Sequence, residues 1–216
     1  MTNALPKQPT LEVSALLARL KAARVVPVIR TSTAALAETV VLWLREAGIT
    51  IFEITMTIPD APALIKDLAS DPNLILGAGT VPDERTARRC IEAGARFIVA
   101  PWVDPNLTEA CADAGAALML GALTPTEVRA ALHAGADVVK IFPASSVGGP
   151  AHIKALASVF PGVSFCPTGG VEPGNVAAYL AAGAAFVGMG GGLVDEKRIA
   201  AGDRAAIEAA ARAVLA

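Results

Sequence analysis

The amino-acid sequence predicts an α/β fold, a (β/α)₈ TIM barrel with an extra N-terminal helix, and two observations carry this prediction. The first is a recurring phrase in which an Ala-rich stretch is followed by Ala-Gly and a short apolar run. This pattern is typical of a helix that ends at a left-handed glycine and passes directly into a strand. Because helices and strands then alternate, the sheet is expected to be parallel. The recurrences are REAGITIFEI (45–54), EAGARFIVAP (92–101), DAGAALMLGA (113–122), HAGADVVKIF (133–142) and AAGAAFVGMG (181–190).

The second observation is the composition. Apolar residues make up 54% of the chain but aromatic residues only 4%, so the interior must be built from Ala, Val, Ile and Leu. This mixture suits buried parallel strands that are covered by Ala-rich helices. A length of 216 residues is enough for one large core, so we expect a single barrel domain over residues 1–216.

Eight strand candidates alternate with helical stretches along the chain, which indicates a closed barrel. Residues 9–23 form an expected extra helix before the first strand, and residues 203–215 form a closing helix. The strand candidates are Val25–Ile29, Thr50–Thr55, Leu74–Leu76, Arg96–Val99, Ala117–Leu120, Asp137–Phe142, Val163–Cys166 and Ala185–Gly188. Helix starts are indicated by capping or first-turn residues at Thr33, Pro82–Glu84, Asp104-Pro105, Thr124–Glu127 and Glu172-Pro173.

An open doubly wound sheet is the alternative fold. That fold usually carries a Gly-rich nucleotide loop after its first strand, whereas here the first strand is followed by Arg30-Thr31-Ser32-Thr33 without a glycine. The longer connections at 77–82 and 142–149 follow the carboxyl ends of strands. A barrel builds its active site at that end, so the barrel is the favoured fold.

Charge and hydropathy exclude several classes of function. The formal net charge is −2 and no basic cluster is present, so nucleic acid is not expected as a partner. No uncharged apolar run reaches the roughly 18 residues that a membrane span needs. The segment MTNALPKQPT lacks the apolar core of a signal peptide, so we expect a cytoplasmic protein.

The cysteines and histidines do not suggest a disulfide framework, a metal site or a cofactor. Cys90, Cys111 and Cys166 are odd in number and far apart, so they are expected to be small buried thiols in a reducing compartment. His133 and His152 lie in expected helical segments, and neither has a second ligand at a typical spacing. No metal site is therefore predicted.

Lys140 is the first candidate catalytic residue. It lies in the apolar sixth strand, where alternation places Val138, Lys140 and Phe142 on one face and Val139 and Ile141 on the other. The outer faces of barrel strands pack against helices and are apolar, so Lys140 is expected to point into the barrel. Burial disfavours the charged form of an amine, and a neutral amine is the form that attacks a carbonyl. The alternative is a lysine that pairs with an inward carboxylate for packing alone.

Glu53 is its expected partner. In the second strand, alternation places Ile51, Glu53 and Thr55 inward and Phe52 and Ile54 outward. Strands two and six are opposite each other in an eight-stranded barrel, so Glu53 and Lys140 can meet near its centre. Such a pair supplies a proton shuttle and a nucleophile, although a purely structural ion pair has the same geometry.

Two glycine-rich loops predict a phosphate site. Pro167–Val171 follows the seventh strand and Gly188–Gly192 follows the eighth, which are the usual phosphate positions of this fold. Backbone N–H groups of glycines can approach an anion without obstruction by side chains. The alternative is that these glycines only form tight turns.

Two further polar residues are candidates for substrate binding. Gly77–Val81 is expected to form a tight turn after the third strand, in which Thr80 offers a hydroxyl group to a substrate. Arg30, just after the first strand, can bind a carboxylate or a phosphate with two N–H groups. Its alternative is an ordinary surface arginine.

With these residues, the chain resembles the 2-keto-3-deoxy-6-phosphogluconate (KDPG) aldolases and the closely similar 4-hydroxy-2-oxoglutarate (KHG) aldolases. The resemblance runs from about Arg24 to Val194. Its carriers are VVPVIR (25–30), FEITMT (52–57), LGAGTV (76–81), VKIFPA (139–144) and FCPTGGV (165–171). The resemblance implies a metal-independent class I aldolase that assembles as a homotrimer.

The resemblance also implies residue roles. The lysine of the K-x-F-P motif falls on Lys140 and forms the Schiff base, and the glutamate of E-x-T falls on Glu53 and acts as general acid and base. Further matches are Thr80 of GAGT, Pro101 after the fourth strand, and Thr168, Gly169 and Gly170 after the seventh. Together with Arg30, Phe142, Gly190 and Gly191, these residues form the predicted substrate-binding set.

Two departures from the family pattern bear on the substrate. Many phosphogluconate-type members carry an arginine where this chain has Thr57, and Arg30 is expected to replace its charge, as in related phosphogalactonate-type members. Many members also have a serine near Gly191, so phosphate binding is expected to depend on backbone donors.

We therefore expect a lyase that cleaves a 2-keto-3-deoxy-6-phospho-sugar acid to pyruvate and glyceraldehyde 3-phosphate. Alternative substrates are 4-hydroxy-2-oxoglutarate and 2-keto-3-deoxy-6-phosphogalactonate. Two alternative classes of function remain. One is a phosphate-binding isomerase or synthase on the same barrel, in which Lys140 is only a cationic group, and the other is a non-catalytic module that binds a phosphorylated metabolite.

Overall fold

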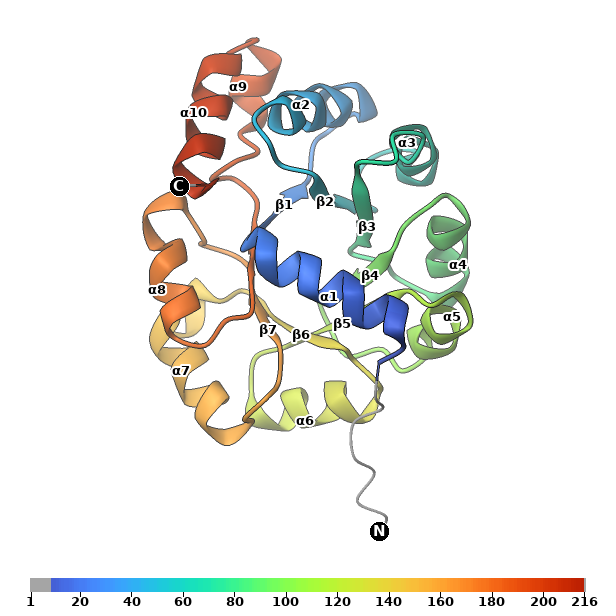
Figure 1. Cartoon of the computed structure of the whole chain (residues 1–216), viewed down its shortest axis with the longest axis vertical. Coiled ribbons are helices and arrows are strands. Elements are labelled where there is room, and N and C mark those ends of the chain that lie inside the picture. The colour runs from blue at the N-terminus through green and yellow to red at the C-terminus, as the bar shows by residue number, and fades with distance from the viewer. Residues whose placement is uncertain (1–8, 216) are drawn as a thin grey trace.

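Eight parallel strands surround a central axis in the computed structural model, which describes residues 9–215 (Figure 1). The strands are β1 Val25–Ile29, β2 Ile51–Thr55, β3 Ile75–Gly79, β4 Phe97–Ala100, β5 Ala117–Ala122, β6 Val138–Ile141, β7 Phe165–Pro167 and β8 Val187–Met189. Their hydrogen-bonded order is β7-β6-β5-β4-β3-β2-β1-β8. Two isolated parallel bridges, Phe165 with Ala184 and Thr168 with Gly188, bring β7 and β8 together. The predicted (β/α)₈ barrel is confirmed, and the open doubly wound sheet is wrong.

Helices form a ring outside the strands, and one further helix lies across one end of the barrel (Figure 1). The α-helices are α1 Leu11–Ala23, α2 Ala34–Glu46, α3 Ala61–Leu68, α4 Glu84–Glu92, α5 Leu107–Ala114, α6 Pro125–His133, α7 Pro150–Val159, α8 Val176–Ala181, α9 Glu196–Ala200 and α10 Arg204–Leu215. Short 3₁₀ turns are η1 Ser145–Val147 and η2 Pro173–Asn175. The expected extra helix is α1 and the expected closing helix is α10. Residues 1–8 belong to the expected domain and to the segment MTNALPKQPT, and they lie outside the described residues, as does residue 216.

The joints between helices and strands follow the recurring phrase in the sequence. In every recurrence, the glycine of the Ala-Gly pair has a positive φ, from +64° at Gly115 to +111° at Gly94. The helix starts expected at Thr33, Asp83 and Thr124 are also confirmed, because each side chain accepts a hydrogen bond from a backbone N–H of the first turn. Local sequence chemistry therefore sets where most elements begin and end.

The third strand corrects one expectation. β3 extends to Gly79, so Gly77 and Gly79 lie within a strand and do not form the predicted tight turn. A Cβ atom at Gly77 would overlap the Phe97 ring, and one at Gly79 would overlap the Glu53 carboxylate. The glycines are there because neighbouring strands fill the space that a side chain would need.

The core has an outer layer and an inner layer. Outward residues such as Phe52, Ile54, Val139 and Ile141 pack between the strands and the surrounding helices. The inner layer consists of inward residues near the amino ends of the strands and of the α1 residues that pack with them. Its members are Val13, Leu16, Leu20, Val26, Ile51, Ile75, Phe97, Val99, Ala117, Met119, Val138, Cys166 and Phe186. The helix α1 therefore closes the amino end of the barrel, and the opposite end is left for a site.

The described part of the chain contains no helix that is both long and apolar enough to cross a bilayer. Cys90, Cys111 and Cys166 are buried and unpaired with one another, as the sequence predicts.

Candidate active site

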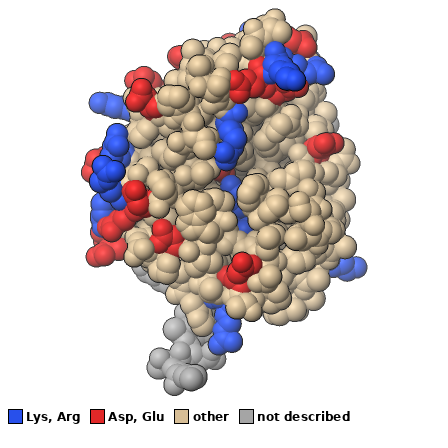
Figure 2. Space-filling model, turned by 180° about the vertical axis from the view of Figure 1, so that it is seen from behind, with Lys and Arg blue, Asp and Glu red and all other residues tan. Residues whose placement is uncertain are grey.

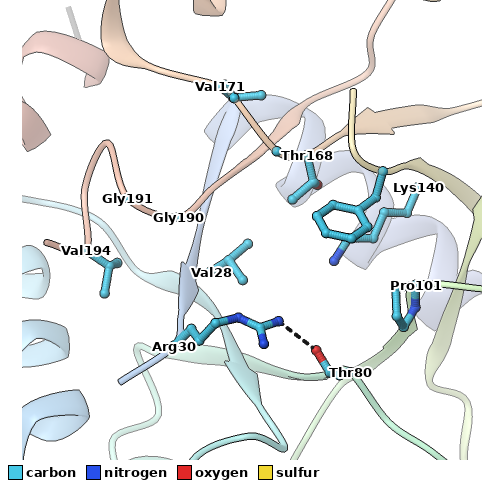
Figure 3. Close-up of a pocket in the computed structure, with 13 residues that line it drawn as sticks. Val28, Arg30, Thr80, Pro101, Lys140, Thr168, Val171, Gly190, Gly191 and Val194 are labelled. Carbon is cyan, nitrogen blue, oxygen red and sulfur yellow. Dashed lines mark hydrogen bonds between the residues drawn. The ribbon is translucent and has the colours of Figure 1, made fainter. Parts of the chain in front are cut away.

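A pocket of about 440 Å³ opens at the carboxyl ends of the strands, opposite α1. Figure 2 looks onto this face and shows basic side chains near its centre, in a hollow among uncharged residues. Figure 3 shows the residues that surround the pocket. They are Val28, Arg30, Thr80, Pro101, Lys140, Phe142, Thr168, Gly169, Gly170, Val171, Gly190, Gly191 and Val194. The structure thus places every predicted substrate-binding residue around one cavity, with Lys140 among them.

Lys140 and Glu53 meet inside the barrel beneath this pocket. The Lys140 Nζ atom lies 3.2 Å from Glu53 Oε1 and 3.5 Å from Oε2, and both residues are only 5% exposed. They come from β6 and β2, which three strands separate in either direction around the barrel. The predicted inward orientation of both side chains is confirmed. An amine that can give a proton to a carboxylate at this distance can become the nucleophile that carbonyl addition requires.

The position of the Glu53 carboxylate depends on the neighbouring strand. Glu53 pairs with Gly77 and Thr55 pairs with Gly79 in the β2–β3 ladder. A side chain at Gly79 would occupy the place of the Glu53 carboxylate. Gly79 on β3 therefore leaves the space in which an acidic group approaches Lys140.

Cys166, on the neighbouring strand β7, is a second buried neighbour of Lys140. It is the direct neighbour of Lys140 in the β6–β7 ladder and is 5% exposed. Burial raises the pKa of this thiol to about 12, and the positive charge of Lys140 opposes that shift. The thiol is therefore neutral near pH 7, and it gives the amine a small, uncharged neighbour.

Phe142 and Pro101 form the apolar rim next to Lys140. The Phe142 ring centroid lies 5.8 Å from Lys140 Nζ, within the range in which an aromatic face stabilises a cation. Pro101 approaches because Gly121 on β5 has no side chain, and a Cβ atom there would overlap the Pro101 backbone. Both residues line the pocket together with the amine.

The two glycine-rich loops differ in why they contain glycine. Gly169 and Gly170 have φ values of +89° and +71°, so the loop after β7 requires glycine for its conformation. In contrast, Gly190 and Gly191 have no positive φ, and no atom lies within 4 Å of the place where a Cβ would stand. The tight-turn interpretation therefore explains the loop after β7, whereas the loop after β8 exposes its backbone to the pocket.

Arg30 reaches across the pocket mouth to two threonines, as Figure 3 shows for Thr80. Its Nη2 donates to Thr80 Oγ1 at 3.0 Å and its Nη1 donates to Thr57 Oγ1 at 3.4 Å. Arg30 is therefore part of the pocket and does not point away from it as an ordinary surface arginine would. Thr57, one of the two departures from the family pattern noted in the sequence, thus contacts Arg30.

Three lining residues were missed by the sequence reasoning. Val28 could have been found, because it lies two residues before Arg30 on a strand whose alternate residues point inward. Val171 and Val194 lie in the loops after β7 and β8, where side-chain direction follows no fixed period. All three add apolar surface to the wall.

The histidines lie apart from the site. His133 is in the last turn of α6, and His152 Nε2 lies 2.7 Å from the Leu123 carbonyl oxygen. Within residues 9–215, no three His, Cys, Asp or Glu side chains cluster as a metal site requires.

A family model described as KDPG and KHG aldolase matches residues 16–210. The chain is 35% identical over 194 residues to a 2-dehydro-3-deoxy-phosphogluconate aldolase of Pseudomonas aeruginosa, covering 89% of this chain and 88% of that protein. It is 38% identical over 160 residues to a probable 2-dehydro-3-deoxy-6-phosphogalactonate aldolase of Rhizobium meliloti, covering 73% of this chain and 75% of that protein. A similar solved structure is the KDPG aldolase of Legionella pneumophila with pyruvate captured at low pH as a covalent carbinolamine intermediate. Its TM-score is 0.83 at 32% identity, over 92% of this chain and 97% of that one.

Proposed function

The chain belongs to the KDPG and KHG aldolase family, and we propose that it cleaves a 2-keto-3-deoxy-6-phospho-sugar acid to pyruvate and glyceraldehyde 3-phosphate through a Schiff base on Lys140. Aldolases are lyases. The observation that carries this proposal is the contact between the Lys140 amine and the Glu53 carboxylate at the base of the pocket. The names of its relatives, and the pyruvate bound in the Legionella enzyme, support the same reaction class.

Schiff-base formation needs one nucleophile and one proton shuttle. The neutral Lys140 amine attacks the C2 carbonyl carbon of the substrate. Glu53 gives a proton to the resulting oxyanion and takes one from the Lys140 nitrogen, which leaves a neutral carbinolamine and a protonated Glu53. Protonation of the C2 hydroxyl by Glu53 then releases water and leaves an iminium ion. The 3.2 Å between Lys140 Nζ and Glu53 Oε1 allows direct proton transfer between the amine nitrogen and the carboxylate.

The iminium ion accepts the electrons of the bond that breaks. Glu53, directly or through water, removes the proton of the C4 hydroxyl, the C4–O bond becomes a carbonyl, and the C3–C4 pair moves into the iminium. The aldehyde leaves, and an enamine of pyruvate remains on Lys140. Glu53 then protonates C3, and addition of water to the regenerated iminium releases pyruvate and the free amine.

The rest of the pocket binds and shields the substrate. Arg30, Thr80 and Thr168 supply donors to its anionic and hydroxyl groups, and the loops after β7 and β8 supply backbone N–H groups. Pro101, Phe142 and the three valines make the remaining wall apolar.

A second substrate, 2-keto-3-deoxy-6-phosphogalactonate, is favoured by one specific observation. The pocket guanidinium comes from Arg30, directly after β1, and it contacts Thr57, two residues after β2. By the family resemblance, the position of Thr57 is arginine in many phosphogluconate-type members. The 38% identical Rhizobium relative is named as a probable aldolase of that substrate.

The test is a panel of three substrates with pyruvate release as the measurement. KDPG, its galactonate epimer and 4-hydroxy-2-oxoglutarate are compared by kcat/KM in the wild type, Lys140→Met and Lys154→Met. Lys154 is an exposed lysine on α7 and serves as the matched control. Pyruvate release that Lys140→Met abolishes and Lys154→Met preserves supports the proposal. Equal activity of both variants contradicts it, and binding without pyruvate release indicates an isomerase, a synthase or a binding module.

Three further properties belong to the same proposal. We expect one domain over residues 1–216, a cytoplasmic location and a homotrimer. Three buried thiols without disulfides suit a reducing compartment, and the trimer follows from the family resemblance. Light scattering after gel filtration should give three times the chain mass of 21.9 kDa, and a monomer or dimer would contradict the trimer.

A further inference from the structure

The charge of Arg30 is held in the pocket but is not neutralised by the protein. The side chain is exposed, and its recorded partners are the hydroxyl groups of Thr57 and Thr80. Arg30 forms no ion pair with a carboxylate of residues 9–215. A guanidinium has five N–H donors, so at least three remain for a ligand after these two bonds. Neutral partners fix the group in place and leave its charge for an anion.

The direction of the hydrogen bonds on one side of Arg30 can be worked out. Thr55 is fully buried, and its hydroxyl donates to the Ile29 carbonyl oxygen at 2.9 Å. A hydroxyl has one proton, so in the 2.8 Å contact between the two threonines Thr57 is the donor and Thr55 the acceptor. Thr57 therefore has no proton left for a ligand. It can only accept, which is what a guanidinium N–H requires.

Thr80 differs from Thr57 in both conformation and donor capacity. Its φ of +57° is unfavourable for a β-branched residue, and such strain is concentrated at functional sites. Its oxygen accepts from Arg30 Nη2, and no described residue accepts its proton. The Thr80 hydroxyl can therefore donate into the pocket next to the unused N–H groups of Arg30.

We propose that Thr55 and Thr57 are positioning residues that orient Arg30, so that its guanidinium, next to Thr80, faces the substrate oxyanion that the proposed function assigns to these two residues. Thr57 therefore has a role of its own, because it holds the Arg30 guanidinium in place. The oxyanion is a carboxylate or a phosphate monoester, because both present acceptor oxygens to a planar fork. This inference rests on the proposed function, since the oxyanion is taken to belong to an aldolase substrate.

The test compares Thr57→Val, Thr57→Ser and Thr126→Val. Valine keeps the shape of threonine but cannot accept a hydrogen bond, whereas serine keeps the hydroxyl group that accepts one. Thr126 is an exposed threonine on α6 and serves as the control. Binding of pyruvate and of inorganic phosphate is followed by tryptophan fluorescence, because Trp102 adjoins Pro101 at the rim and the signal needs no turnover. In Thr57→Val, the Kd of one probe should rise about tenfold, the scale for loss of a hydrogen bond to a charged group. Thr57→Ser should restore it, and Thr126→Val should match the wild type.

The two probes distinguish the two sources of the oxyanion. A higher Kd for pyruvate assigns Arg30 and Thr80 to the keto-acid carboxylate, and a higher Kd for phosphate assigns them to the phosphate. For the matching substrate, KM should rise with kcat within about twofold, because uniform binding is lost and the chemistry on Lys140 is not.

A double-mutant cycle separates positioning from a general structural effect. In an Arg30→Met background, Thr57→Val should cause no further change in Kd, because the residue that it orients is gone. The proposal is overturned if Thr57→Val leaves the Kd of both probes unchanged, if serine does not restore binding, or if the two changes are additive. Failure of the wild type to release pyruvate would instead contradict the aldolase function, and the Kd measurements would still decide the role of Thr57.

Discussion

The two ends of the barrel are built from the same strands and carry opposite chemistry. At the amino end, inward residues such as Ile51 and Val138 pack against Leu20 of α1 in an apolar layer. Two residues further along the same strands, the inward positions are Glu53 and Lys140. The interior therefore changes from apolar to charged between two consecutive inward residues of one strand.

This difference suggests a division of roles. Packing against α1 stabilises the amino end. The carboxyl end contains a buried ion pair, a left-handed threonine and an arginine that donates to two threonine hydroxyl groups. Such features are costly for stability and useful for chemistry. Substitutions at the two ends should therefore change different observables.

Glu53→Gln should give the largest effect on activity among these substitutions. Glutamine keeps the shape of the side chain but cannot shuttle protons, so kcat should fall about 10²–10⁴-fold, the usual contribution of a general acid–base group. Steady-state kinetics with pyruvate detection measures it, with Glu38→Gln on the exposed face of α2 as control. A kcat within threefold of the wild type would show that the pair with Lys140 is only structural.

Leu20→Ala should give the converse result at the amino end. Leu20 is fully buried in the inner layer, so its truncation should lower the free energy of unfolding by about 2–5 kcal/mol. Urea unfolding measures this change, and Leu11→Ala on the same helix, where the side chain is 90% exposed, should be nearly neutral. The kcat of Leu20→Ala well below its melting temperature should match the wild type, and a large loss would contradict the division between the ends.

Gly79→Ala tests the boundary between the two ends. The added methyl group overlaps the Glu53 carboxylate, so the free energy of unfolding should fall by about 1–3 kcal/mol. Displacement of the carboxylate by about 1 Å should also lower kcat by about 10²-fold. Gly174→Ala is the control, because no atom lies within 4 Å of its Cβ position and its φ is not positive. Loss of stability without loss of kcat would show that the position of Glu53 is not critical.

The buried thiol of Cys111 should make the stability of the protein depend on pH. This thiol lines a small cavity with Val13 of α1, and burial raises its pKa to about 12. Below the unfolded-state pKa of about 8.5, both states are protonated and the thiol adds no pH dependence. As pH rises toward the folded-state pKa, the unfolded state loses its proton first, so stability falls by up to about 1.4 kcal/mol per pH unit.

Urea unfolding of Cys111→Ala between pH 8 and pH 10.5 measures this contribution. The variant should lose stability less steeply above about pH 9 than the wild type, by at most one thiol's share. Equal slopes for the two proteins would mean that water reaches this part of the core.

The features that could be predicted from the sequence are those with a local cause. Strand alternation places Lys140 and Glu53 inward, the position of their strands in an eight-strand order places them on opposite walls, and glycines such as Gly94 mark the helix ends. Each follows from the period of one element or from the order of elements along the chain.

The features that could not be predicted depend on contacts between elements. Gly77 and Gly79 were expected to form a turn, but their role is set by Phe97 and Glu53 on neighbouring strands. The contacts of Arg30 join the segments that follow β1, β2 and β3, and Val194 reaches the pocket from the loop after β8. No spacing within one segment of sequence encodes such distances.

The most direct test of the Schiff base is reductive trapping with pyruvate. Borohydride reduces an iminium but not an amine, so incubation with pyruvate and borohydride should inactivate the enzyme and add one reduced pyruvate to the peptide that contains Lys140. Peptide mapping by mass spectrometry locates the adduct, and Lys140→Met should form none while Lys154→Met forms it as the wild type does. An adduct at another lysine, or continued trapping in Lys140→Met, would contradict the assignment of Lys140 as the nucleophile.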